Sequence, residues 1–324
     1  MLWGVSAYFS PAAERSPPAS LAWFSAAVRR QGLPLLIVEL AFGDRPFQLA
    51  ADLADRVLRV RAPDLMWQKE RLLNLGIAAL PDDCDAVVWL DTDILFENDD
   101  WVARTRALLG QHGLVQPFDR VCWLGPGQRQ APPAARRGLG EGMWLPGMAA
   151  AMAASRTPAR DLLDYLRHGH TGFAWAARRD LIQRHGLYDR AIVGGGDVVM
   201  AHAFYDDRDF RRGCNPYSNK LGVRERDGMA HWAAGLAADR GGPPAAVGGR
   251  VLHVYHGPLS DRGYAERLRL LKEADFDPQA DLALTGSGCW RWGSAKPDLH
   301  RAVADYLRDR AAGAAAALTP GAPP

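Results

Sequence analysis

The sequence predicts an α/β protein with a mostly parallel, wound sheet, flanking helices and a C-terminal helical extension. Two observations indicate this class. Up to Gln116, short apolar runs rich in β-branched residues alternate with segments of helical spacing, which is typical of a parallel sheet. The clearest run, Ala86–Leu90, ends abruptly in polar residues, as a strand buried on both faces does. With 324 residues, the chain is long enough for one large domain or two small ones.

The first half of the main domain, residues 1–120, alternates regularly. Helices are expected at Leu21–Arg30, which Gly32 and Pro34 end, at Gln68–Leu80, which Pro81 ends, and at Trp101–Leu109. Apolar runs indicate strands at Trp3–Phe9, Leu35–Leu40, Arg56–Val60, Ala86–Leu90 and Leu114–Gln116.

The second half, residues 121–260, is less regular. Residues 125–147 are rich in Gly, Pro, Ala and Arg and indicate a long loop. Trp144 in this loop is either the hydrophobic tip of a lid or an ordinary docked side chain. Strands are expected at Phe173–Ala177 and Arg250–His256, and helices at Arg179–His185, Asp197–Phe204 and Ala230–Ala238.

A helical extension is expected over residues 261–311, after the main domain of residues 1–260. Helices are expected at Ser260–Ala274 and Pro297–Arg310, the second with Leu299, Val303 and Leu307 on one face. Residues 312–324 contain no charged and no aromatic side chain, which indicates a disordered tail.

Composition narrows the function classes and the compartment. The formal net charge of +2 gives no argument for nucleic acid or an acidic membrane as the partner of the whole chain. The four cysteines lie far apart with no C-x-x-C pair, which favours reduced thiols and a cytoplasmic protein. The N-terminus reads as a strand and not as a signal peptide, and no stretch has the length and apolarity of a transmembrane segment.

Asp91 and Asp93 directly follow the strand Ala86–Leu90. Open α/β sheets bind ligands at the carboxyl ends of their strands, and alternation places two residues so spaced on the same side of an extended chain. Two such carboxylates suit Mn²⁺ or Mg²⁺, with a bound diphosphate completing the site. The alternative is that they solubilise a loop or help to cap the following helix.

Two histidines, His253 and His256, lie in the last predicted strand. Imidazole binds Mn²⁺ and heavier divalent ions well. An uninterrupted strand would point the two rings to opposite faces, so both can serve one ion only if the strand breaks near Tyr255. The alternative is one packed and one exposed histidine.

The segment Gly194-Gly195-Gly196-Asp197 precedes a predicted helix. Three glycines allow the backbone and a ligand to approach closely, so Gly195 and Gly196 are candidates for the acceptor site. Asp197 is either the helix N-cap or a general base that takes a proton from an attacking hydroxyl.

Further candidates come from isolated residues. Lys69 and Arg71 could reach an anionic ligand, although a solvated helix face is the more frequent explanation. Glu39, taken as the end of its strand, could bind a nucleobase or ribose. Trp144 and Trp175 could stack on sugar rings, although most tryptophans belong to the core.

Taken in order, these features resemble the GT-A glycosyltransferases, closest to the family-2-like and galactosyltransferase-like branch, over residues 1–260. The features that match are a helix with Asn74-x-Gly76, Asp91-Thr92-Asp93 after a strand, Gly194–Asp197, and His253-x-x-His256. The resemblance implies a Rossmann-like GT-A fold. Residues 1–120 would bind the nucleotide sugar, with Glu39, Lys69, Arg71 and Asn74 among its contacts, and residues 121–260 would bind the acceptor.

The resemblance also implies a reaction and its cofactors. Asp91 and Asp93 would hold Mn²⁺ (or Mg²⁺) and the ribose or diphosphate of a nucleoside-diphosphate sugar, expected to be UDP-linked. His253 and His256 would complete the metal shell, and Asp197 would be the base, with Gly196 where such enzymes have an acidic partner. The acceptor, whether glycan, lipid, protein or modified nucleic acid, stays open.

Two other enzyme classes are less compatible with the sequence. A phosphohydrolase of the haloacid-dehalogenase type needs Thr or Val where Leu95 stands and a later Gly-Asp-x-x-x-Asp, where Ala201 stands instead of the last Asp. A sugar-nucleotide pyrophosphorylase needs a Gly-rich, Arg-containing loop after the first strand, where Ser10-Pro11-Ala12-Ala13 stands. A catalytically silent carbohydrate-binding protein of the same fold stays an alternative.

Overall fold

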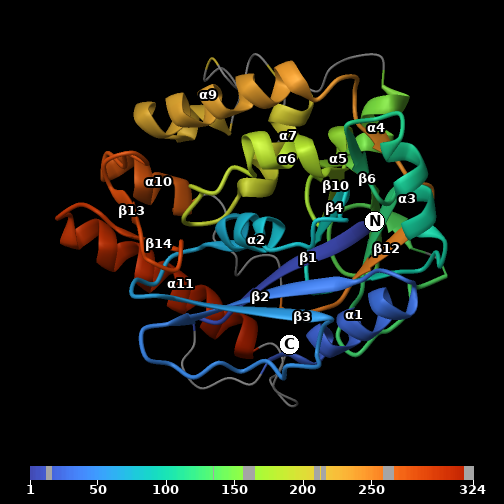
Figure 1. Cartoon of the computed structure of the whole chain (residues 1–324), viewed down its shortest axis with the longest axis horizontal. Helices are drawn as coiled ribbons and strands as arrows, with labels where there is room; N and C mark the ends of the chain where they lie inside the picture. The colour runs from blue at the N-terminus through green and yellow to red at the C-terminus, as the bar shows by residue number, and fades with distance from the viewer. Residues whose placement is uncertain are drawn as a thin grey trace.

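A seven-stranded sheet forms the centre of the computed structural model, which describes residues 1–11, 17–133, 135–155, 165–207, 212, 217–257 and 266–316 (Figure 1). The strand order is β11-β6-β10-β4-β1-β2-β3. Strands β1, β2, β3 and β4 pair in parallel, whereas β10 is antiparallel to both β4 and β6. The predicted α/β class with a mostly parallel sheet is therefore confirmed. The strands are β1(Leu2–Phe9), β2(Leu35–Phe42), β3(Arg56–Ala62), β4(Ala86–Leu90), β6(Leu114–Gln116), β10(Ala174–Arg178) and β11(Ala245–Ala246).

Both faces of this sheet are covered, which explains why β2 and β4 are buried at every residue. Alternate residues of β2 enter different cores: Leu36 and Val38 belong to one apolar cluster, and Leu35 and Ile37 to another. Helices α2(Lys69–Ala78), α4(Met148–Ala154), α6(Arg179–His185), α7(Gly196–Phe204) and α9(Val223–Asp239) contribute to the first cluster, and α1(Ala19–Arg30) and α3(Trp101–Leu109) to the second.

Helix α2 approaches the sheet very closely at Gly76. A Cβ added to this glycine would lie 2.6 Å from Val5 Cγ1 and 2.8 Å from Val38 Cγ2. Packing thus favours glycine here, and the close contact holds the C-terminal half of α2 against β1 and β2.

A second, five-stranded sheet has the order β5-β12-β7-β9-β8. Its strands are β5(Ile94–Phe96), β7(Arg120–Trp123), β8(Arg136–Arg137), β9(Met143–Pro146) and β12(Arg250–His253). The prediction of an uninterrupted loop over residues 125–147 is wrong at β8 and β9. Leu145 and Trp144 pair with Val121 and Cys122 of β7, because their apolar side chains extend the core under this sheet.

The C-terminal extension contains α10(Glu266–Glu273), the hairpin β13(Leu282–Leu284) and β14(Trp290–Trp292), and α11(Pro297–Ala316). The sequence did not predict the hairpin. A third apolar cluster joins this extension to Met66, Ile192 and Val193 of the main domain. The extension therefore packs on the segments that precede α2 and α7. Two short helices, α5(Tyr165–His168) and η1(Ser218–Lys220), complete the described elements.

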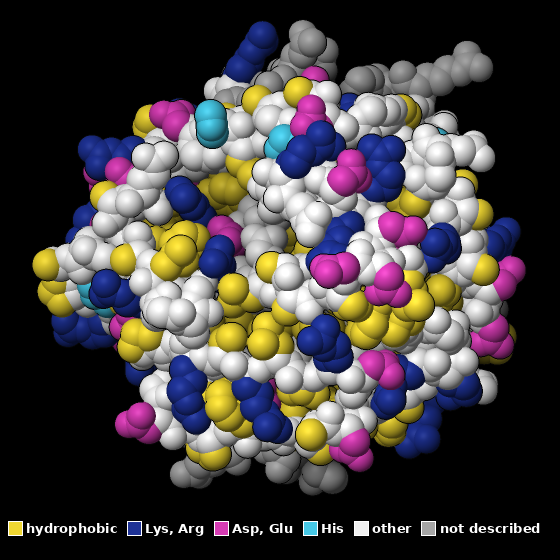
Figure 2. Space-filling view, viewed as in Figure 1, with side chains coloured by type: hydrophobic (Ala, Val, Ile, Leu, Met, Phe, Trp, Pro, Cys, Tyr) yellow, Lys and Arg dark blue, Asp and Glu magenta, His cyan; other side chains and the backbone are white. Residues whose placement is uncertain are grey.

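The end of the chain differs in part from the prediction. Helix α11 runs to Ala316, so residues 312–316 are helical and not a disordered tail, because alanine, the strongest helix former, continues the helix that Leu299, Val303 and Leu307 anchor. Residues 317–324, and the predicted boundary at 260/261, lie outside the described residues. Among the helices that the structure describes, none has the length and apolarity needed to cross a membrane. Basic and acidic side chains are interspersed over the face shown in Figure 2.

Candidate active site

The segment after β4 is held from two sides. The strand ends at Leu90, and the Asp91 N–H donates to the Phe173 carbonyl oxygen at 2.8 Å. The Asp93 carbonyl oxygen accepts a hydrogen bond of 2.7 Å from the Val254 N–H. Because residues 91–93 form a turn and not an extended strand, strand alternation does not apply to them, and the two carboxylates take different partners: Asp91 pairs with a lysine, and Asp93 with two histidines.

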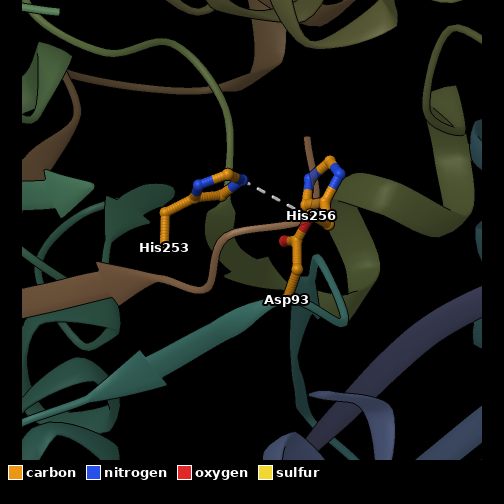
Figure 3. Close-up of side chains that lie close together, drawn as sticks. All are labelled: Asp93, His253 and His256. Carbon is orange, nitrogen blue, oxygen red and sulfur yellow. Dashed lines mark ion pairs between the residues drawn. The ribbon is translucent and has the colours of Figure 1, made fainter. Parts of the chain in front are cut away.

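Asp93 meets both predicted histidines (Figure 3). Its Oδ2 lies 2.9 Å from His256 Nε2 and 3.5 Å from His253 Nε2. The sequence required a break near Tyr255 for both rings to reach one point, and β12 does end at His253. One ligand atom from each of these three residues lies within 4.8 Å of the other two, a spacing that a single metal ion could bridge.

The electrostatics of Asp93 suit a cation. Burial opposes ionisation of this carboxyl, but His253 and His256 outweigh it and hold the pKa of Asp93 well below its ordinary value of 3.8. Its Oδ1 is buried and has no hydrogen-bond partner within the described part of the chain. One carboxylate and two imidazoles form a donor set that Mn²⁺ accepts, and the two nitrogens make Mg²⁺ a poorer fit.

Phe173 helps to position this cluster. Its ring stacks on His170 at a centroid distance of 3.9 Å and lies 5.0 Å from the His253 ring. Its φ of 75° is uncommon for a residue with a side chain. The same residue therefore orients one histidine and, through its carbonyl group, holds Asp91.

Asp91 belongs to a different group of charges. It forms an ion pair with Lys69 at the start of α2. Burial raises the pKa of Asp91, Lys69 lowers it, and Asp93 and Asp197 raise it again, so that it lies above its ordinary value. Burial lowers the pKa of Lys69, but Asp91, Glu70 and Asp197 together raise it above normal, so Lys69 is fully charged. The structure thus brings Lys69, Asp91 and Asp197 together.

The glycine segment forms the start of α7. Gly194 and Gly195 have φ values of 86° and 95°, which favour glycine, and Gly195 is the N-cap residue. Asp197 follows in the first turn, so it is not the N-cap that the sequence offered as its alternative role. Its Oδ2 would lie 2.7 Å from a Cβ added to Gly172, which shows how closely this carboxylate packs on the Gly172 backbone.

Two predicted donor-binding residues, Arg71 and Asn74, form bonds within the protein's own structure. Arg71 pairs with Asp189 at 3.1 Å and donates to the Gly288 carbonyl oxygen. Asn74 donates to the Leu187 carbonyl oxygen at 2.9 Å and accepts from the Leu187 N–H at 2.8 Å. These bonds tie α2 to the segment after α6 and to the C-terminal hairpin, and they leave neither side chain for a nucleotide.

The Glu39 side chain also forms bonds within the protein's own structure. Strand β2 continues to Phe42, so Glu39 does not end it, and the side chain is only 2% exposed. Its carboxylate accepts from the backbone N–H groups of Gln48 and Leu49 and pairs with Arg59 at 3.5 Å. Glu39 therefore holds the loop between β2 and β3, and the structure does not support it as a nucleobase or ribose ligand.

The positions of Trp144 and Trp175 differ from those that the sequence suggested for an acceptor site. Trp175 is 1% exposed, and its Nε1 donates to the Thr171 carbonyl oxygen at 2.8 Å, so it offers no face to a sugar. Trp144 lies within β9 and not at a loop tip, and the Arg120 guanidinium lies 4.6 Å from the centroid of its ring.

The sequence missed three residues beside the glycine segment. Glu70 lies against Gly196, and the guanidinium groups of Arg267 and Arg310 lie within 4 Å of a Cβ added to Gly194. The guanidinium carbon of Arg310 also lies 4.5 Å from the centroid of the Trp67 ring. Each is a charged residue of a helix, and only the fold shows that it points toward the site.

A cavity of about 410 Å³ lies elsewhere, between the carboxyl ends of β2 and β3 and helix α11. None of the predicted site residues lines it, so it is separate from the predicted catalytic centre. Its basic lining residues are Arg45, His300, Arg301 and Arg308.

The comparisons with known proteins are weak. No protein-family profile matches the chain, and no curated protein matches its sequence. Among solved structures, it is similar to glucosyl-3-phosphoglycerate synthase from Mycobacterium tuberculosis (15% identity, 90% of this chain and 86% of that chain, TM-score 0.39). It is also similar to the catalytic domain of Drosophila β1,4-galactosyltransferase 7 (15% identity, 63% of this chain, TM-score 0.32), of whose length the match spans only 60%.

A third similar structure is 4-diphosphocytidyl-2C-methyl-D-erythritol synthase from Anaerococcus prevotii (12% identity, 76% of this chain and 88% of that chain, TM-score 0.34). TM-scores this low carry no conclusion about activity, so the proposed function rests on the geometry of the site.

Proposed function

We propose that this protein is a metal-dependent glycosyltransferase that moves a sugar from a nucleoside-diphosphate sugar, expected to be UDP-linked, to an acceptor hydroxyl. The observation that carries the proposal is the convergence of Asp93, His253 and His256 at the carboxyl end of β4, beside Lys69 and Asp91. A metal-ligand cluster next to a fixed cation is an arrangement suited to a diphosphate.

The charged and metal-ligating residues have separate proposed roles. Asp93, His253 and His256 would hold Mn²⁺, which neutralises the negative charge that develops on the leaving diphosphate, a contribution of several kcal/mol. Lys69 is 19% exposed and keeps its positive charge next to Asp91, so it is placed to contact a diphosphate oxygen. Asp91, 25% exposed, is the proposed contact for the ribose or the metal.

Asp197 is the proposed base. It lies at the start of α7, behind the two glycines with positive φ, and it interacts electrostatically with both Lys69 and Asp91. A carboxylate there would take the proton of the acceptor hydroxyl as that oxygen attacks the anomeric carbon. The C–O bond to the diphosphate breaks in the same displacement, and the diphosphate leaves with the bonding electron pair.

Titration calorimetry with UDP tests the donor half of the proposal. UDP affinity should depend on Mn²⁺ and be lost on chelation, and Fe²⁺ and Zn²⁺ belong in the same panel because the same ligands bind them. Equal affinity with and without metal contradicts the proposal. Release of inorganic phosphate from phosphomonoesters, without UDP binding, favours the phosphohydrolase instead.

The base is tested by Asp197→Asn. Transfer and slow donor hydrolysis should both fall about 10²–10⁴-fold, whereas UDP affinity should survive because Asp197 is not among the metal ligands. An unchanged rate in this variant would show that Asp197 is not the base. Metal-dependent UDP binding without hydrolysis or transfer in the wild type favours the silent carbohydrate-binding protein.

A further inference from the structure

A buried carboxyl group covers the start of α7. Glu70, the second residue of α2, is 3% exposed, and a Cβ added to Gly196 would lie 2.5 Å from both its Cδ and its Oε1. Non-bonded contacts this short essentially never occur at a Cβ, so a side chain at residue 196 requires the buried Glu70 side chain to move. Unlike Gly194 and Gly195, Gly196 has no positive φ. Contact with Glu70, and not the backbone conformation, therefore restricts the residue at this position.

The surroundings of Glu70 are charged. Lys69, Asp91 and Asp197 all interact with it electrostatically. Burial raises the pKa of Glu70 to about 7 from an ordinary value of 4.5. Burying a carboxyl group costs free energy that an apolar side chain of similar size would avoid, so packing alone gives no reason for Glu at this position.

We propose that Glu70 is a positioning residue for Asp197: α2 places an acidic group against the first turn of α7, where Gly196 leaves space for it, and Glu70 and Gly196 form a matched pair. This inference rests on the proposed role of Asp197 as the base. Glu70 occupies the space beside the first turn of α7 and so restricts where the Asp197 carboxylate can lie. Its 3% exposure excludes direct contact with a large substrate.

An exchange experiment tests the pair. Glu70→Gln keeps the volume and removes the acid, and Glu70→Ala removes both. The double variant Glu70→Ala/Gly196→Glu returns a carboxyl group to the same space from α7. Glu225→Gln is the matched control, because Glu225 is 1% exposed, its pKa is raised by burial to about 8, and none of the three atoms nearest to the Gly196 Cβ position belongs to it.

The readouts are UDP affinity with Mn²⁺, the melting temperature, and kcat and KM for hydrolysis of the UDP-sugar that the wild type hydrolyses fastest. Glu70→Gln and Glu70→Ala should lower kcat about 10- to 100-fold, as the loss of a supporting partner does, with UDP affinity unchanged. Gly196→Glu alone should melt at a lower temperature. The double variant should melt near the wild type and recover most of kcat, and Glu225→Gln should keep kcat.

Wild-type kcat in Glu70→Gln overturns the inference, and so does a double variant that folds but stays as slow as Glu70→Ala. If the double variant does not fold, Glu70→Gln decides alone: a lower kcat at an unchanged melting temperature supports the inference. Absence of Mn²⁺-dependent UDP binding by the wild type is a different result, which contradicts the proposed function and not the pairing of Glu70 with Gly196.

Discussion

The two carboxylates of one short motif, Asp91 and Asp93, lie in opposite environments. Asp93 faces two imidazoles, which hold its pKa well below normal, and its Oδ1 is buried with no hydrogen-bond partner among the residues that the structure describes. Asp91 faces Lys69, but burial and the nearby carboxylates raise its pKa. Of these two aspartates, Asp93 is thus suited to a metal ion and Asp91 to a fixed ion pair. The neighbours that the fold provides, and not the residue type, set the role of each carboxylate.

The strongest test of this contrast is Asp93→Asn. It removes a proposed metal ligand and no core volume, so transfer should fall about 10³-fold or more while the circular dichroism spectrum stays that of the wild type. The measurement is transfer rate beside Mn²⁺ titration. Undiminished activity would contradict the assignment of Asp93 to the metal.

Asp91→Asn is the matched comparison. Because Asp91 is not in the cluster with His253 and His256, Mn²⁺ affinity should fall less than in Asp93→Asn, by about 10-fold against about 100-fold or more. Calorimetric Mn²⁺ titration of both variants measures the difference. Equal losses would show that the two carboxylates bind the ion equally, as the sequence alone suggested.

His256→Ala tests the other side of the cluster. A water molecule can replace one neutral ligand, so activity should fall about 10-fold, less than for Asp93→Asn. Because the His256 side chain is 29% exposed, the melting temperature should change little. Added imidazole should restore part of the rate, and a rate unaffected by the mutation would remove His256 from the proposed ligand set.

The smallest expected effect is on stability against pH. With a pKa near 7 in the fold and 4.5 in the unfolded chain, Glu70 contributes stability that is fully present below pH 4.5 and lost as the pH rises through 7. The loss is at most about 3 kcal/mol. Glu70→Gln should remove this dependence, so denaturation of both proteins at pH 4.5 and pH 8 gives the test. Asp93 has the opposite sign, because its depressed pKa gives stability that is lost as the pH falls below 3.8.

If wild type and Glu70→Gln lose stability in parallel between pH 4.5 and pH 8, the raised pKa of Glu70 is wrong. Glu225 titrates in the same direction, since burial raises its pKa to about 8. Glu225→Gln therefore separates the contribution of Glu70 from that of the other buried carboxyl.

The sequence by itself determined most strands of the central sheet and the points where polar residues end them. Apolar runs such as Ala86–Leu90 are buried on both sides of a parallel sheet, so their pattern alone identifies them. The end of that run placed Asp91 and Asp93 at the carboxyl edge of the sheet. The spacing of His253 and His256 indicated that both could reach one ion only if the strand broke between them. These are properties of neighbouring residues, which a linear pattern records.

Only the tertiary structure decided which side chains meet. Glu39, Arg71 and Asn74 looked available for a nucleotide, yet Glu39 bonds to the loop after its strand, and Arg71 and Asn74 bond to segments far along the chain. The sequence did not single out Glu70, yet it is buried against Gly196. The reason is physical: burial and partner choice depend on how helices pack on the sheet. A charged residue on a helix has the same local pattern whether it faces water or the site.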